Sequence, residues 1–440
     1  MRIKFFTAIL IGTLYQISFA QNFDKTKLDN YFNALEANNK FMGSVAVSKG
    51  GVIIYSKTVG FSDVENNVKA NELSKYRIGS ITKTFTAVLV LKAMGEKKIK
   101  LDEKLSRYYP TIKNADKITI EDLLYHRSGI HSFTDDDDYE SWSTQPKTKK
   151  ELTNIISKGD SEFEPGSKFK YSNPNFILLS FILEDIYGKS YAELLQEKII
   201  KPLGLSNTFF GEYINEKNNE CYSYSFTNKN WVKESETNTS IPMGAGGIVS
   251  TPTDLTKFSE ALFSGKIISE KSLEQMTTLK DGFGMGIFPL PFHEIKGLGH
   301  TGAIDGFSSI LVYFPDNKVS FALISNGDNY NNNSISIAVL SAVFNKPYDI
   351  PDFKIFNISS EELDKYLGVY TTKDLPLKLT ITKAENTLIA QATGQQKLPL
   401  VARGKDVFAF DRAGIVLEFN PENQTIVLKQ GGGEFLFTKE

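Results

Sequence analysis

The sequence predicts an α+β protein with an antiparallel sheet flanked by helices, a largely helical part, and a small antiparallel β-barrel domain at the end. Three observations support this fold class. Strand-like apolar runs occur in residues 43–55 and again in residues 299–325, so early and late strands would share one sheet. Residues 176–200 contain apolar side chains at helical spacing. Residues 366–437 alternate short apolar runs with turns about every ten residues, which is typical of a barrel.

Local patterns define the expected elements, because glycine and proline punctuate the apolar runs and capping residues open the helices. In chain order, these elements are a helix over 24–38, a hairpin over 43–55, an apolar helix from about residue 80, a short helix over 120–125, helices over 176–187 and 191–200, a flexible glycine-rich loop over 243–248, a helix capped at Thr251 or Thr253, strands over 299–303, 307–313 and 319–325, and a helix over 334–344.

Length and composition indicate two globular domains. The chain of 440 residues exceeds the usual size of one core, and a hydrophobic content of 41% is enough to bury two. Pro347 and Pro351 bracket a linker, so we expect one domain at residues 21–348 and a β-barrel domain at residues 355–440. The net charge of -2 provides no electrostatic basis for binding nucleic acid or an anionic membrane surface. Length, composition and charge do not decide the oligomeric state.

The N-terminal segment has the pattern of a secretory signal peptide, residues 1–20. Met1-Arg2-Ile3-Lys4 is a basic start, an apolar run occupies residues 5–17, and Ser18-Phe19-Ala20 is a small-x-small cleavage site. The apolar run is too short for a membrane anchor. We therefore expect cleavage after Ala20 and export of a mature chain without a transmembrane segment, to the periplasm or outside the cell. The single cysteine, Cys221, excludes an intrachain disulfide.

Ser80 and Lys83 are the candidate reactive residues. They are three apart at the start of an apolar helix, so an amine would lie beside a hydroxyl on one helix face. Residues 85–91 are apolar almost all round, which indicates a buried helix. Burial lowers the pKa of a lysine from about 10.4 towards values at which the neutral amine can act as a base. Backbone N–H groups at a helix start can also stabilise an oxyanion.

A structural explanation of the same residues remains open at this point. Ser-x-x-Lys is a short pattern, and Ser167-Lys168-Phe169-Lys170 also matches it. Ser80 could be a helix N-cap, and Lys83 a surface lysine whose stem packs on the helix. Tyr-x-Asn is equally weak alone, since Tyr31-Phe32-Asn33 matches as well as Tyr171-Ser172-Asn173.

The order of three motifs along the chain favours a catalytic role for these residues over a structural one. Ser80-x-x-Lys83 precedes Tyr171-Ser172-Asn173, which opens a helix, and His300-Thr301-Gly302 begins a sheet strand. In this order they resemble the serine β-lactamase and penicillin-binding protein superfamily, whose related signature has Ser-Asp-Asn and Lys-Thr-Gly. The Tyr-Ser-Asn form resembles class C β-lactamases, DD-carboxypeptidases, D-aminopeptidases and esterases, and His-Thr-Gly favours the peptidases and esterases. The resemblance covers about residues 25–345, and the tail is similar to the lipocalin-like domain of some members.

The resemblance implies a β-lactamase-like fold and a catalytic role for three residues. Ser80 would be the nucleophile that forms an acyl-enzyme, and Lys83 and Tyr171 would together take and return its proton. A serine hydroxyl needs such a base at neutral pH, and either a neutral lysine or a tyrosinate can supply it. Which of the two is the base stays open, and no metal or organic cofactor is implied.

The resemblance also implies substrate contacts. Asn173 would bind the amide on the acyl side, and the backbone N–H groups of Ser80 and Ala303 would form the oxyanion hole. His300 and Thr301, with Gly302 completing the motif, would bind the leaving-group side or its carboxylate. His126 and His131 lie outside the motifs, and we interpret them as helix-end and loop histidines.

The leading hypothesis is therefore an exported serine hydrolase that cleaves amide bonds in peptides containing D-amino acids, as a DD-carboxypeptidase or D-aminopeptidase does. An esterase acting on short acyl esters and a β-lactamase are alternatives with the same machinery. An alternative of another class is a non-catalytic protein that binds penicillin or peptides. The expected partners are thus a small peptide, an ester or a β-lactam. The sequence does not decide the physiological substrate or the role of the C-terminal domain.

Overall fold

The computed structural model describes residues 23–440, so the predicted signal peptide lies outside the described residues. Helix α1 (Lys25–Ala37) begins after Asp24, whose side chain accepts a hydrogen bond from the backbone N–H of Lys27. This contact is a typical N-cap. The helix buries one apolar stripe against the sheet that follows, as the spacing of Phe32 and Leu35 predicted.

The central sheet joins the early hairpin to the late strands, as predicted. β1 (Phe41–Lys49) pairs antiparallel with β2 (Val52–Val59) on one side and with β13 (Val319–Asp328) on the other. The strand order is β10-β11-β12-β13-β1-β2, and a further hairpin, β7-β8, pairs with β13. The other strands of this sheet are β7 (Tyr224–Thr227), β8 (Asn230–Lys233), β10 (Phe288–Pro289), β11 (Leu298–Ile304) and β12 (Phe307–Phe314).

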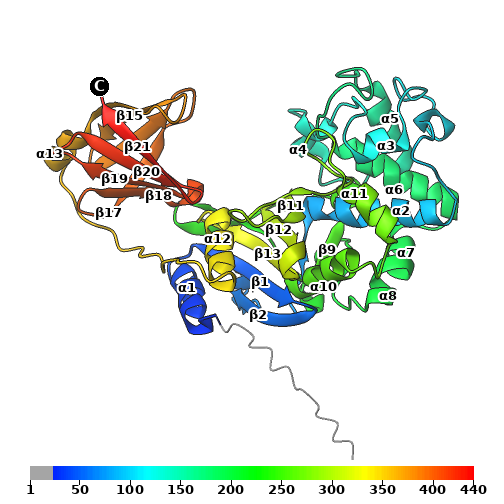
Figure 1. The fold of residues 1–440 in the computed structure, drawn as a ribbon, viewed down its shortest axis with the longest axis horizontal. Coiled ribbons are helices and arrows are strands. Elements are labelled where there is room, and N and C mark those ends of the chain that lie inside the picture. The colour runs from blue at the N-terminus through cyan, green and yellow to red at the C-terminus, as the bar shows by residue number, and fades with distance from the viewer. Residues whose placement is uncertain (1–22) are drawn as a thin grey trace, which may run out of the picture.

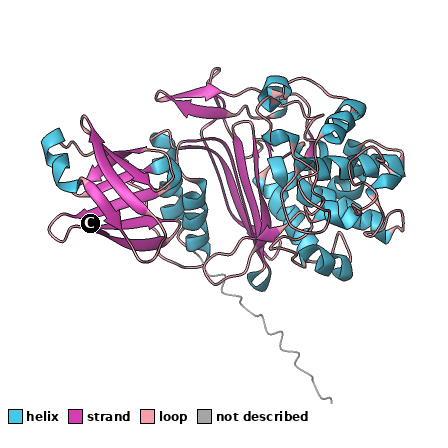
Figure 2. Ribbon diagram, turned by 90° about the horizontal axis from the view of Figure 1, so that it is seen from above, coloured by secondary structure: helices cyan, strands magenta, loops and turns pink. Residues whose placement is uncertain are grey.

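Helices cover both faces of the sheet, as Figure 2 shows from above. One apolar cluster packs α1 and α12 against β1 and β13, and a larger cluster packs the other helices on the opposite face. No helix among residues 23–440 has the length and apolar character needed to cross a membrane. The helices are α2 (Thr82–Gly95), α3 (Ile120–Leu124), α4 (Tyr139–Trp142), α5 (Lys149–Lys158), α6 (Asn173–Tyr187), α7 (Tyr191–Leu195), α8 (Lys201–Leu203), α9 (Met243–Gly246), α10 (Pro252–Phe263), α11 (Glu270–Thr277) and α12 (Asn332–Val343).

Two segments differ from the prediction. The helix expected over 191–200 changes after Leu195 into a π-helical turn that continues through α8 to Gly204. The segment 243–248 is not a flexible loop: it forms the buried turn α9 and then strand β9 (Ile248–Ser250). The prediction was wrong because α2 holds this segment, and Thr86 donates a hydrogen bond of 2.6 Å to the carbonyl of Gly244. Such a contact, between residues far apart in sequence, leaves no local pattern.

Short strands tie the helical part to the sheet region. β9 pairs with β5 (Tyr76–Arg77) on one side and with β6 (Phe209–Phe210) on the other. β3 (Phe61–Asp63) and β4 (Val68–Lys69) form a separate ribbon. The chain therefore enters the first motif directly from a paired strand, which fixes the position of Ser80 relative to β9.

The C-terminal region is a closed antiparallel barrel of β14 to β21, in agreement with the predicted β-barrel domain. Its inward side chains, including Phe408, Leu417 and Phe437, are buried in one apolar cluster. The barrel lies beside α12 and away from α2 (Figure 1). Asp411 connects it to the sheet region through an ion pair with Lys40 at 2.7 Å. A short helix, α13 (Ser360–Leu363), precedes the barrel strands, which are β14 (Gly368–Thr371), β15 (Lys378–Ala384), β16 (Thr387–Ala392), β17 (Leu398–Gly404), β18 (Val407–Phe410), β19 (Ile415–Asn420), β20 (Thr425–Gln430) and β21 (Gly433–Lys439).

Candidate active site

Ser80 lies where a tight turn becomes a buried helix. Residues Gly79–Ile81 form a 3₁₀ turn, and α2 continues from Thr82 with almost every side chain buried. Ser80 itself is partly exposed, whereas Lys83 is 0% exposed. The structure therefore excludes the alternative in which Lys83 is a surface lysine.

Lys83 Nζ contacts three oxygen atoms in the buried site. Its Nζ lies 3.0 Å from Ser80 Oγ, 2.7 Å from Asn173 Oδ1 and 2.7 Å from the carbonyl oxygen of Ala245. The last two atoms can only accept hydrogen bonds. An ammonium could donate to all three oxygens, whereas a neutral amine has two hydrogens for the two acceptors and a lone pair that can take the proton of the serine hydroxyl. Burial also lowers the pKa of Lys83 well below its usual value, which favours this neutral form.

Tyr171 lies close to the same amine. Lys83 Nζ is 4.9 Å from the centre of the Tyr171 ring. Burial raises the pKa of Tyr171, and the contact of its hydroxyl with Ser80 only partly offsets this rise. The two pKa shifts have opposite directions, and each favours the neutral form of its group: the amine of Lys83 and the phenol of Tyr171. This arrangement favours Lys83 over a tyrosinate as the proton acceptor.

His126 contacts Tyr171, which the sequence did not reveal. The two rings stack with centroids 4.3 Å apart, and His126 Nδ1 accepts a hydrogen bond of 3.1 Å from the backbone N–H of Ser172. Burial lowers the pKa of His126, so it is neutral here. His126 thus lies just after the end of α3, and its buried ring packs against the phenol ring. His131, in contrast, is a partly exposed loop residue that contacts Asp136 and Glu162.

Asn173 connects the first two motifs. Its Oδ1 accepts from Lys83, and its Nδ2 donates to Thr134 Oγ1 at 2.9 Å. Both ends of the amide are therefore occupied by protein groups. A substrate that binds Asn173 must replace the contact with Thr134, because the contact with Lys83 keeps the amine oriented.

The third motif approaches Ser80 through two glycines. A Cβ on Gly302 would lie 2.1 Å from the carbonyl oxygen of Ile78 and 3.0 Å from the backbone nitrogen of Ser80. A Cβ on Gly79, which has a φ of +50°, would lie 2.8 Å from the backbone nitrogen of Ala303. Only glycine fits at such distances. Strand β11 therefore lies directly against the turn that carries Ser80, and the backbone nitrogens of Ser80 and Ala303 both lie where the two segments meet.

His300 and Thr301 differ in their exposure to solvent. Thr301 is exposed, whereas His300 is buried between the rings of Tyr171 and Phe288, with centroid distances of 6.4 and 4.9 Å. Burial is the main cause that lowers the pKa of His300 to about 3. His300 is therefore neutral and provides no positive charge for a carboxylate.

A small cavity of about 170 Å³ opens beside Ser80, and Asn173 and Ala303 also line it. Asp305 is the one charged residue among the described residues that line it. Its apolar walls consist of Phe133, Tyr139, Ile177, Ile241, Pro242 and Ile304. A cavity of this size and character accommodates a small acyl group.

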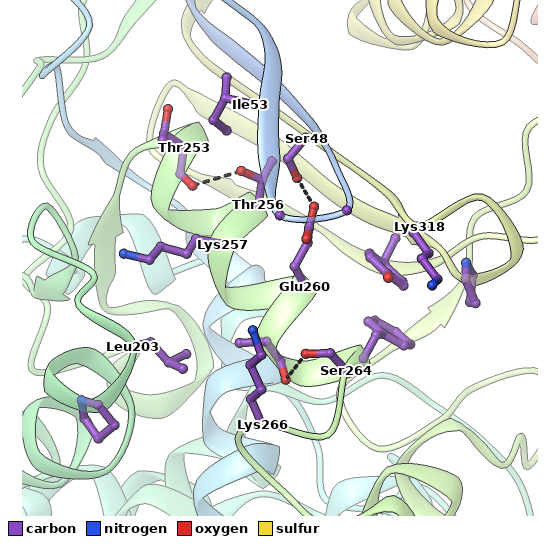
Figure 3. Close-up of a pocket in the computed structure, with 17 residues that line it drawn as sticks. Ser48, Ile53, Leu203, Thr253, Thr256, Lys257, Glu260, Ser264, Lys266 and Lys318 are labelled. Carbon is purple, nitrogen blue, oxygen red and sulfur yellow. Dashed lines mark hydrogen bonds between the residues drawn. The ribbon is translucent and has the colours of Figure 1, made fainter. Parts of the chain in front are cut away.

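A larger cavity of about 830 Å³ lies between the β1–β2 turn and α10 (Figure 3). Lys257, Lys266 and Lys318 line it, and Ser48 donates a hydrogen bond to Glu260 within it. None of the motif residues lines this cavity. The smaller cavity beside Ser80 is therefore the candidate active site.

The beta-lactamase family model matches residues 28–343. The chain belongs to this family. A penicillin-binding protein of Bacillus subtilis (strain 168) is 24% identical over 445 residues, which cover 92% of this chain and 97% of that protein. A teichoic acid D-alanine hydrolase of Staphylococcus aureus (strain MRSA252) is 30% identical over 247 residues, which cover 56% of this chain and 59% of that protein.

A solved structure of a D-stereospecific amidohydrolase from Streptomyces sp. superposes with a TM-score of 0.60 and 29% identity, covering 68% of this chain and 94% of the other. The hydrolase relatives and the geometry of the first motif identify this family member as a serine hydrolase. They disfavour the alternative of a non-catalytic binding protein.

Proposed function

We propose that this protein hydrolyses amide bonds of D-amino acid derivatives through a covalent acyl-enzyme on Ser80. The observation that carries the proposal is the fully buried Lys83, whose Nζ lies 3.0 Å from Ser80 Oγ. Relatives named as a D-alanine hydrolase and a D-stereospecific amidohydrolase support the substrate class.

In the proposed mechanism, Ser80 Oγ attacks the acyl carbon while Lys83 Nζ takes the serine proton. The backbone N–H groups of Ser80 and Ala303 stabilise the resulting oxyanion, each by about 3 to 4 kcal/mol. The Tyr171 hydroxyl gives its proton to the leaving nitrogen and regains one from Lys83, so the C–N bond breaks and an ester on Ser80 remains. Water then attacks this ester, and the same groups return the proton to Ser80 as the acid leaves.

The other motif residues have binding roles in this proposal. Asn173 binds the amide on the acyl side after it releases Thr134. Thr301, which is exposed, contacts the leaving-group side across the Gly302 backbone, whereas His300 supports the Tyr171 ring as a neutral residue.

Intact-mass spectrometry of the mature protein and of Ser80→Ala tests the proposal. Each protein is exposed to penicillin, a D-Ala-D-Ala-like thioester and p-nitrophenyl acetate. We expect an adduct or turnover that Ser80→Ala abolishes, because the alanine side chain has no oxygen that can attack the acyl carbon. The fastest donor then ranks peptide, β-lactam and ester substrates. Absence of any Ser80-dependent reaction with all three donors would refute the proposal.

An esterase activity on short acyl esters is the second candidate. The cavity of about 170 Å³ beside Ser80 supports it, because its apolar walls suit a small acyl group whatever the leaving group is. Esters also react more easily than amides with the same nucleophile. Ester turnover that exceeds amide turnover by more than the intrinsic reactivity ratio would favour this candidate.

Export and domain boundaries belong to the same proposal. Residues 1–20 are proposed to be removed after Ala20, which places the enzyme in the periplasm or outside the cell. Residues 21–348 are proposed as the hydrolase domain and residues 355–440 as the barrel domain. N-terminal sequencing of the protein secreted from its host, and limited proteolysis at the linker, test these two statements.

A further inference from the structure

The two N–H donors of the proposed oxyanion hole come from segments that are far apart in the sequence. Ser80 lies in the turn after strand β5, and Ala303 lies near the end of strand β11. An oxyanion hole stabilises the transition state only when both donors lie about 2.7 to 3.1 Å from the position of the oxyanion. Contacts that join these two segments therefore control the geometry of the hole.

The first such contact is a hydrogen bond next to the hole. Ser309 Oγ donates to the carbonyl oxygen of Ile78 at 2.9 Å. Ser309 is the partner of Gly302 across the β11–β12 hairpin, and Ala303 is the next residue of β11. This hydrogen bond therefore anchors the hairpin on one side of Ala303.

The second contact is a buried ion pair at the tip of the same hairpin. Ile304 pairs with Phe307, so Asp305 and Gly306 form the two-residue turn. Asp305 has a φ of +52°, a left-handed value that aspartate and asparagine tolerate. Its Oδ2 accepts a hydrogen bond of 3.0 Å from Arg77, and the two side chains are each 3% exposed. Strand β11 is thus anchored on both sides of its N–H donor.

Both members of this ion pair are held by further contacts. Arg77 donates to the carbonyl oxygens of Thr237 at 2.6 Å and of Glu212 at 3.1 Å. It also pairs with the carboxylate of Glu236 at 3.1 Å. Asp305 Oδ1 accepts from the backbone N–H of Thr237 at 3.0 Å. Both oxygens of the Asp305 carboxylate are therefore engaged by protein groups, which suits a residue that holds the hairpin in position.

The ion pair spans the hole at close range. Arg77 is three residues before Ser80, and Asp305 is two residues after Ala303. Segments of two or three residues extend at most about 7 to 11 Å, so a shift of the pair reaches both donors. Separation of a buried ion pair is costly, because the protein interior does not hydrate the two charges. The pair therefore opposes any movement of β11 away from the turn that carries Ser80.

We propose that the Arg77–Asp305 ion pair positions the two N–H donors of the oxyanion hole and so sets the rate of acyl transfer. The inference rests on the proposed function and adds a pair of positioning residues to it. An oxyanion forms when Ser80 attacks the substrate and again when water attacks the acyl-enzyme. Loss of the pair should therefore slow both steps, which lowers kcat and leaves KM nearly unchanged.

The test compares the hydrolysis of p-nitrophenyl acetate by the wild type and by Asp305→Asn. Asparagine tolerates the left-handed turn and removes the charge that binds Arg77. We expect kcat to fall by about tenfold to a hundredfold, because a displacement of about 1 Å in an active site can cost a hundredfold. The inhibition constant of phenylboronic acid should rise with it, because the tetrahedral boron adduct on Ser80 mimics the transition state and places an oxygen in the hole.

Glu236→Gln is the matched control, because Glu236 pairs with the same arginine but lies outside the hairpin. We expect its kcat, KM and inhibition constant to stay close to those of the wild type. Partial loss of folded protein would lower the apparent kcat without changing the inhibition constant of the remaining enzyme. A fall in kcat at an unchanged inhibition constant, or equal losses in both variants, would therefore overturn the inference.

The inference and the proposed function can fail separately. Wild-type activity that requires Ser80 but that Asp305→Asn leaves unchanged would overturn only the inference, whereas absence of any Ser80-dependent reaction would refute both. If Asp305→Asn does not fold, the double variant Arg77→Gln/Asp305→Asn decides, because it leaves neither charge of the pair without its partner. A kcat and an inhibition constant like those of the wild type in the double variant would overturn the inference.

Discussion

The lysines of the two cavities have opposite surroundings. Lys83 is fully buried and makes three hydrogen bonds, one of them to Ser80, beside a cavity of about 170 Å³. Lys257, Lys266 and Lys318 are exposed around a cavity of about 830 Å³. An exposed ammonium keeps its hydration, whereas a buried amine loses its proton and becomes a base. The buried amine of Lys83, and not the size of the cavity, therefore indicates which cavity is the candidate active site.

Removal of the buried amine should have the largest effect. Lys83→Met is expected to lower kcat by about a thousandfold, because general-base catalysis contributes factors of this order. Lys266→Met, in the other cavity, is the control and should leave kcat unchanged. The two variants are compared by steady-state turnover and by the rate of acylation in intact-mass spectra. Comparable losses in both would contradict the distinction between the cavities.

The pH dependence of kcat/KM should reflect the protonation of Lys83. Lys83 is active when neutral, so kcat/KM should rise with pH up to the pKa of Lys83 and then level off. Because burial lowers this pKa well below 10.5, the rise should occur well below that pH. The pKa of His300, lowered to about 3, places its titration below this range. A profile that still rises at pH 10, or a rise that His300→Asn abolishes, would contradict this assignment.

A change that disturbs the close approach of β11 to Ser80 should have the next largest effect on kcat. Gly302→Ala should lower kcat by about a hundredfold, because the new Cβ would displace one N–H donor of the oxyanion hole. Gly95→Ala at the end of α2 is the control, since nothing lies within 4 Å of its added Cβ. Circular dichroism establishes that both variants fold, and turnover then separates them. Full activity of Gly302→Ala would exclude the proposed oxyanion hole.

Loss of the ring that packs against Tyr171 should lower kcat by a smaller factor. His126→Asn removes the stacked ring and is expected to lower kcat by about threefold to tenfold, which corresponds to the energy of one aromatic pair. Asparagine suits the left-handed backbone at this position, where φ is +55°. KM should change little if His126 acts only through Tyr171. His131→Asn, on the surface, is the control and should leave both kcat and KM unchanged.

Removal of the barrel should have the smallest effect on catalysis. None of the residues that line the cavity at Ser80 comes from residues 355–440, so deletion of this segment should change kcat/KM by no more than about threefold. Thermal unfolding should show a modest loss of stability, because contacts such as the Lys40–Asp411 ion pair disappear. A change in the preference between small and large donors would instead show that the barrel controls access to the site.

Local patterns predicted much of the fold. The β1–β2 hairpin, the strands β11 to β13 and the closed barrel appear where alternation and turns placed them, because strand periodicity and turn chemistry are local properties. The prediction of a flexible loop for segment 243–248 was wrong, because the helical turn of this segment depends on a hydrogen bond from α2. His126 and Asp305 were not identified for a similar reason: each acquires its contacts only after distant segments come together.

The sequence by itself determined the order of the motifs, the family and the residues Ser80, Lys83 and Tyr171 as candidates. Only the tertiary structure decided that Lys83 is fully buried between Ser80, Asn173 and a backbone carbonyl, where burial lowers its pKa. It also paired the Asp305 carboxylate with the buried Arg77, at a residue that lines the cavity. Burial and charge pairing arise from the packing of segments far apart in the chain, so they cannot be derived from residue spacing alone.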